Sequence, residues 1–87
     1  MQDWITEALT KGLGPDALAV TDESHLHAGH AGARPGGETH FRIDVVAAAF
    51  AGKGRVDRHR IVNDLLAEAF SRRGLHALAI KARAPGE

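Results

Sequence analysis

The sequence predicts a small α+β domain in which three strands form one sheet and helices cover one of its faces. Alternating apolar residues mark half-buried strands over 39–46 and 76–83. Apolar pairs that recur every four residues over 61–70 mark an amphipathic helix. A chain of 87 residues is long enough for one compact core and too short for two. We therefore expect a single domain over residues 1–87, with the helices packed on one face of the sheet.

The first half of the chain predicts a helix, a strand and a loop. Asp3 is available as an N-cap for a helix over about 3–12, and Gly12, Gly14 and Pro15 are its stop signals. A short β-type run follows over 17–22. Residues 24–38 hold four glycines and a proline without periodicity, which predicts a mobile, exposed loop. The apolar residues that give the helix its spacing are Trp4, Ile5, Ala8, Leu9 and Leu13.

The second half predicts a strand, a long helix and a third strand. In the strand over 39–46, we expect Phe41, Ile43 and Val45 to be buried and His40 to face solvent. After a glycine-flanked turn at 52–54, which could add a short helix, Asp57 can cap the long helix. Its expected end is marked by Arg72, Arg73 and Gly74, and its apolar stripe comprises Ile61, Val62, Leu65, Leu66, Ala69 and Phe70.

The composition predicts a thin core and excludes several kinds of site. Sixteen of the apolar residues are alanine and four are Phe or Trp, so each core position buries little area. The absence of cysteine excludes disulfides, thiolate nucleophiles and any cysteine-ligated metal site built by this chain alone. The start of the chain lacks a signal-peptide pattern, and no run is long enough for a membrane span, so we expect a cytoplasmic protein without a membrane partner.

Local charge is uneven although the net charge is zero. Cations in the first turn of a helix oppose the helix dipole, which requires some compensation. One interpretation is that these residues bind nucleic-acid phosphates; the other is that they form a solvated face in which Arg58 and Arg60 pair with acidic neighbours such as Asp64. The candidate residues are Lys53, Arg55, Arg58, His59 and Arg60.

Histidines supply the candidate metal ligands, and no residues assemble a catalytic site. His25, His27 and His30 belong to the expected loop and lack the fixed spacing of a zinc motif. His76 is the first residue of the expected third strand and lies on the same face as the core-facing Leu78 and Ile80. It is therefore either a structural residue or a ligand at the domain edge. Without a nucleophile-elbow pattern, we expect neither an enzyme nor a small-molecule substrate.

Four ordered motifs carry a resemblance to the BolA family, from about Leu9 to Pro85. They are Val20-Thr21-Asp22-Glu23-Ser24, Glu38-Thr39-His40-Phe41-Arg42-Ile43, Phe50-Ala51-Gly52-Lys53 with Arg58-His59-Arg60-Ile61-Val62-Asn63, and His76-Ala77-Leu78-Ala79-Ile80. The resemblance implies an αββααβ fold similar to a class II KH domain. It also implies two roles, partnership with a monothiol glutaredoxin around a shared [2Fe-2S] cluster, and DNA binding in transcription regulation through a helix-turn-helix-like surface.

The resemblance also implies which residues would hold the cluster. The family's C-terminal histidine ligand matches His76, and its loop ligand matches His30 best, then His27, then His25. A [2Fe-2S] cluster needs four ligands, so two imidazoles leave the cluster incomplete and the chain holds none alone. A glutaredoxin cysteine and a glutathione from the partner side would supply the sulfurs. Such a mixed centre should weaken as falling pH protonates the imidazoles. Zero net charge favours this role over DNA binding.

Overall fold

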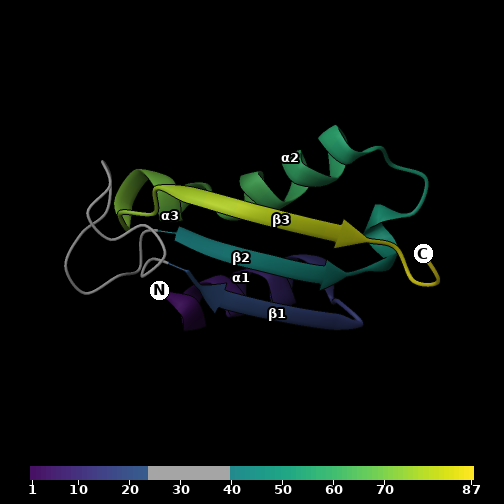
Figure 1. The fold of residues 1–87 in the computed structure, drawn as a ribbon, viewed down its shortest axis with the longest axis horizontal. Coiled ribbons are helices and arrows are strands. Elements are labelled where there is room, and N and C mark those ends of the chain that lie inside the picture. Colours follow the sequence, from purple (N-terminus) through teal and green to yellow (C-terminus); the bar gives the residue numbers. More distant parts are fainter. Residues whose placement is uncertain (24–39) are drawn as a thin grey trace.

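The computed structural model describes residues 1–23 and 40–87, which form an αββααβ fold around a three-stranded sheet (Figure 1). The sheet order is β1-β2-β3, with β1 antiparallel to β2 and β2 parallel to β3. No helix in these two ranges is long and apolar enough to cross a membrane. The elements are α1 (Gln2–Leu13), β1 (Ala17–Asp22), β2 (His40–Val46), the 3-10 helix η2 (Ala48–Phe50), α2 (Arg55–Leu65), α3 (Ala67–Arg72) and β3 (Ala77–Arg83).

The helices cover one face of the sheet, as the sequence predicts. Along β2, Phe41, Ile43 and Val45 are buried while Arg42 between them is exposed. On β1 and β3 half-buried residues alternate with exposed ones, so the opposite face of the sheet stays open. Figure 1 shows α1 behind the sheet and α2 running beside β3. The core lies between this helical layer and the sheet, and its buried residues are Ile5, Leu9, Phe41, Ile43, Val45, Ala47, Phe50, Val62, Leu66, Ala69, Leu75 and Ala84.

Two predicted helix caps are wrong, although the helices themselves are confirmed. The N-cap of α1 is Met1, so Asp3 lies inside the first turn, where its charge suits the helix dipole. The N-cap of α2 is Gly54, whose extended backbone lets the helix begin two residues earlier than Asp57. Of the predicted stop signals, Gly14 is confirmed, because it adopts a left-handed conformation with φ of 54°. Gly12 lies inside α1 and does not end it.

The predicted long helix is divided in two. Leu66 has φ of −106° and ψ of 15°, which departs from helical geometry and separates α2 from α3. Leu66, at the break, and Ala69, in α3, are both buried in the core. Phe70 has 40 % of its surface exposed, so its assignment to the buried stripe is wrong. The apolar repeat continues across the break and therefore gave no sign of it.

Candidate metal-binding and cationic sites

One end of the sheet brings two histidines together. Because β2 and β3 are parallel, their N-terminal ends lie at the same end of the sheet, and His40 pairs in register with Ala77. His76 immediately precedes β3. The centroids of the His40 and His76 rings are 5.3 Å apart, and their planes are tilted by 49°. Imidazoles at this separation can act on one ligand or support one another.

The two imidazoles differ in exposure. His40 is only 8 % exposed, so the prediction that it faces solvent is wrong. His40 is the first residue of the central strand, and β3 lies on one side of it. On the other side, the His40 carbonyl accepts a hydrogen bond of 2.8 Å from the Glu23 amide. His76 is exposed. The outer ring can therefore meet a ligand or a partner, while the inner ring packs beside it.

A small cavity of about 150 Å³ lies at this end, lined by Glu23, His40, Phe41, Ala77, Leu78 and Ala79. The Glu23 carboxylate accepts a hydrogen bond of 3.1 Å from the Arg42 side chain. Within residues 1–23 and 40–87, no group of three or more His, Cys, Asp or Glu side chains could hold a metal ion. The predicted loop ligands, His25, His27 and His30, lie outside the described residues.

The sequence did not indicate His40 as a partner of His76. The alternation in the strand assigned it to the solvent side, and the two residues are 36 positions apart in the chain. Only the parallel register of β2 and β3 brings them into contact. A parallel pairing is not visible in a single sequence, because any of several strand orders would satisfy the same alternating pattern.

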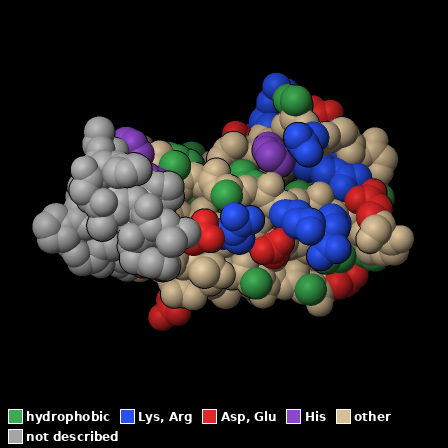
Figure 2. All heavy atoms as spheres, viewed as in Figure 1, with side chains coloured by type: hydrophobic (Ala, Val, Ile, Leu, Met, Phe, Trp, Pro, Cys, Tyr) green, Lys and Arg blue, Asp and Glu red, His purple; other side chains and the backbone are tan. Residues whose placement is uncertain are grey.

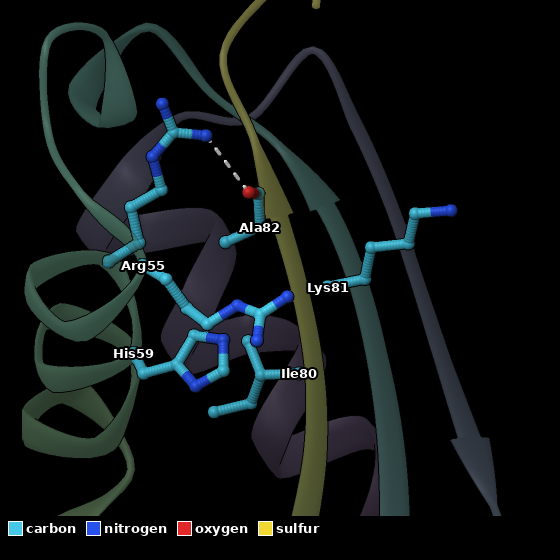
Figure 3. Close-up of a pocket in the computed structure, with 6 residues that line it drawn as sticks. Arg55, His59, Ile80, Lys81 and Ala82 are labelled. Atoms are coloured by element: carbon cyan, nitrogen blue, oxygen red, sulfur yellow. Dashed lines mark hydrogen bonds between the residues drawn. The ribbon is translucent and has the colours of Figure 1, made fainter.

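The predicted cationic residues gather around the start of α2, at the other end of the sheet. Figure 2 shows Lys and Arg side chains over the C-terminal half of β3 and the start of α2. Arg55 and His59 are one helical turn apart and share a face of α2. In Figure 3 both point toward Ile80 of β3. A cavity of about 230 Å³ separates the two elements and is lined by Arg55, Arg58, His59, Ile80, Lys81 and Ala82.

Arg58 differs from its neighbours because the protein itself binds its guanidinium. The two terminal nitrogens donate to the Glu87 carboxylate at 2.5 and 2.7 Å, and one of them also donates to the Ala82 carbonyl at 3.1 Å. Its Nε donates to the Lys53 carbonyl at 2.7 Å. Only 13 % of the side chain is exposed. Arg58 thus ties the turn, β3 and Glu87 together, and this compensates a cation near the start of a helix.

This contact changes the ionisation of Glu87. The hydrogen bond from Arg58, with a second from the Ala84 amide, lowers the pKa of Glu87 from 4.5 to about 2. The same contact raises the pKa of Arg58. A carboxyl whose pKa is depressed on folding stabilises the fold above its ordinary pKa, and that contribution is lost as the pH falls toward the folded value. The relevant window is therefore pH 4.5 to about 2.

We expect Glu87→Gln to lower the melting temperature at neutral pH and to lose most of this penalty near pH 2. Gln keeps the size and a hydrogen-bonding carbonyl but removes the charge that holds Arg58. The measurement is thermal unfolding of both proteins across the window. Glu7→Gln is a suitable control, since Glu7 makes a single exposed pair with Lys11 at 2.7 Å. A difference between Glu87→Gln and the parent that is independent of pH would contradict the assignment.

The remaining cations are more available. Arg60 lies 4.0 Å from Asp57, both well exposed, and neither Arg58 nor Arg60 forms the predicted ion pair with Asp64. Lys53 and Arg55 are exposed, and among the described residues no ion pair involves them. His59 is half-buried at the groove. The structure thus separates the predicted set into one residue that the fold uses and four that lie at the surface.

Comparison with known proteins supports one assignment for this fold and these motifs. The sequence model of the family described as BolA-like protein matches residues 9–87. The chain belongs to the BolA family. The BolA domain of SufE1 from Arabidopsis thaliana superposes with a TM-score of 0.87 and 46 % identity, over 97 % of this chain and 91 % of that one.

Relatives from distant organisms agree with the family assignment. An uncharacterized Sinorhizobium protein, encoded in the cobS 5' region, is 46 % identical over 100 % of this chain and 94 % of its own length. BolA-like protein 1 from Homo sapiens is 43 % identical over 95 % of this chain, which corresponds to 57 % of the human protein. The chain therefore spans nearly all of the bacterial relative and little more than half of the human one.

Proposed function

We propose that this BolA-family chain is a non-catalytic adaptor that shares a [2Fe-2S] cluster with a monothiol glutaredoxin, with His76 as its principal iron ligand. The observation that carries the proposal is the pair of imidazoles at one end of the sheet. His76 is exposed, and the buried ring of His40 lies 5.3 Å away. A buried side chain beside a surface ligand limits the orientations of the ligand, which favours metal binding.

The second ligand of this chain is proposed to come from residues 24–39, where His30 is the first candidate and His27 the second. This segment follows Glu23 and precedes His40, and both residues lie at the same end of the sheet as His76. An extended chain spans up to about 3.5 Å per residue, so the ten positions between His30 and His40 give ample reach. Chain length therefore permits either histidine to act with His76.

The donor chemistry requires a partner. Imidazole nitrogen is an accepted ligand of iron in [2Fe-2S] centres, where it replaces thiolate on one iron. Because the chain has no cysteine, the remaining ligands must be sulfurs from outside it. A glutaredoxin cysteine and a glutathione bound by the glutaredoxin would supply them. The cluster is then shared across the interface, and neither a resident cofactor nor a substrate is needed on this side.

The test is an anaerobic titration of this chain into a cluster-loaded monothiol glutaredoxin with glutathione, followed by visible absorption and circular dichroism. We expect the bands to shift and to saturate near one chain per cluster-bound glutaredoxin, because exchange of sulfur for imidazole alters the iron-centred transitions. The matched control is the same glutaredoxin without its cluster, which shows whether the two proteins associate when no iron is present. A visible spectrum unchanged by excess chain would contradict the shared cluster, even if the two proteins associate.

A second candidate function is nucleic-acid-binding regulation of transcription, favoured by the exposed cations around α2. Lys53, Arg55 and Arg60 lie at the surface there, with His59 beside them. We expect DNA affinity to fall steeply with salt, and Arg55→Ala and Arg60→Ala each to reduce the salt slope by about one. Arg58→Ala is unsuitable, since it also removes the contact to Glu87. Affinity independent of salt and of both variants would exclude this surface.

A further inference from the structure

The outer edge of β3 presents backbone groups that the described residues leave unpaired. The Arg83 carbonyl accepts a hydrogen bond of 3.0 Å from the Ala47 amide, so it faces the β2 side. The Ala82 carbonyl accepts from Arg58 and faces the opposite way. Because backbone groups alternate along a strand, those of Ile80 and Leu78 point outward like those of Ala82. An edge of this kind can pair with another strand.

A groove runs beside this edge. The cavity of about 230 Å³ between α2 and β3 shares Arg55 and His59 with a second hollow of about 380 Å³ on the outer face of α2. The second hollow is also lined by Val56, Arg60 and Asn63. Figure 3 shows the Arg55 side chain reaching across the groove to Ile80, whereas Lys81 extends away over the open face of the sheet. The two hollows thus adjoin at Arg55 and His59.

Charge and polarity in this groove indicate what it would bind. Arg55 makes no ion pair among the described residues, so its charge is available to an anion. Val56 is 68 % exposed, more than any other large apolar side chain in residues 1–23 and 40–87. A free cation beside an exposed apolar side chain suits an acidic peptide, whereas a phosphate backbone offers nothing to pair with Val56.

We propose that the groove between α2 and β3 binds an extended acidic peptide segment of a protein partner, which adds as a fourth strand to the outer edge of β3. The backbone of the peptide pairs with the outward groups of Ile80 and Leu78, an acidic side chain pairs with Arg55, and an apolar one covers Val56. Arg58 already occupies the Ala82 carbonyl. The added strand is therefore short and stops before the C-terminal end of β3.

The groove lies at the other end of β3 from the histidine pair. His76 precedes the first residue of β3, whereas Ile80 and the residues that line the groove lie in its second half and in α2. Only Leu78, where the added strand ends, also lines the small cavity beside His40. The peptide site makes no use of iron and does not depend on the proposed cluster. A partner could therefore engage either surface alone, and the two can be tested separately.

The experiment uses the full chain and a fluorescein-labelled peptide of alternating Glu and Val residues. Anisotropy measures affinity, and amide chemical shifts locate the contact. We expect the Leu78 and Ile80 amides to move most, and a matched Lys/Val peptide not to bind. Arg55→Glu should weaken binding by about tenfold or more, the scale of one charge-assisted hydrogen bond. This variant should fold normally, because an acidic residue suits the first turn of a helix.

Two control variants complete the design. Arg72→Glu reverses an exposed cation at the end of α3 and should leave affinity unchanged, as should His76→Ala. The proposal is overturned if Arg55→Glu binds as well as the parent, if the shifts map away from β3, or if His76→Ala abolishes binding. It is also overturned if a single-stranded oligothymidylate of equal charge displaces the peptide and binds more tightly, since the groove would then be a nucleic-acid site.

Discussion

Replacing Phe50 by alanine is expected to lower the free energy of unfolding by about 3 to 5 kcal/mol, the usual cost of removing a buried phenyl ring. Phe50 ends the short helix η2 and is fully buried in the core. Domains are stable by about 5 to 15 kcal/mol in total. A small domain is expected near the lower limit, so this one substitution should leave much of the protein unfolded at room temperature. Urea denaturation followed by circular dichroism measures the change.

Phe70→Ala is the matched control, because it makes the same chemical change at a side chain that is 40 % exposed. Its expected cost is about 1 kcal/mol or less, since the ring leaves a smaller cavity and already contacts water. The ratio between the two losses is more informative than either value. Equal losses would mean that Phe50 does not have the special place in the core that its burial indicates.

The reason for this sensitivity is visible in the sequence. Alanine supplies sixteen of the apolar residues, and only three phenylalanines are present. Among residues 1–23 and 40–87, Phe41 and Phe50 are the two largest fully buried side chains. Between small residues, two aromatic rings contribute a large share of the buried apolar area. When one ring is removed, the small residues around it cannot fill the cavity that it leaves.

The strands and helices were predictable because their patterns are local. The alternation over 39–46 and 76–83 and the stop at Gly14 each depend on a few neighbouring residues. The break at Leu66 was not predictable, since the apolar repeat runs through it without interruption. The N-caps were misplaced by two and by three residues because neither Met1 nor Gly54 caps its helix with a side-chain hydrogen bond.

The candidate sites were predictable only in part. The basic residues around the start of α2 were visible in the sequence. That Arg58 is bound within the protein while the others are exposed was not, because its partner Glu87 lies 29 positions away. His76 was visible through the family resemblance. Its neighbour His40 was assigned to the solvent side from the alternation of apolar and polar residues. That alternation fails at the first residue of β2, where both His40 and Phe41 are buried. Contacts between distant residues thus account for both misses.

Replacing His76 by glutamine is expected to abolish the spectral change when the chain is added to cluster-loaded glutaredoxin. Glutamine keeps much of the size of the side chain, but its amide does not replace imidazole as an iron ligand. His40→Gln should instead keep the form of the spectrum and weaken the affinity by about 10- to 100-fold, the usual cost of removing a residue that orients a metal ligand. The two losses differ in kind because one ring is exposed and the other is buried.

His59→Gln is the matched control, because this imidazole lies in the groove beside α2 and away from the histidine pair. It should leave both the spectrum and the affinity unchanged. Far-ultraviolet circular dichroism of His40→Gln separates lost orientation from lost folding, as His40 is largely buried. If His40→Gln folds and binds like the parent, the ring contact with His76 has no role in binding. If His76→Gln produces the same spectrum as the parent, His76 is not an iron ligand, and the histidines of residues 24–39 alone would have to supply the ligands of this chain.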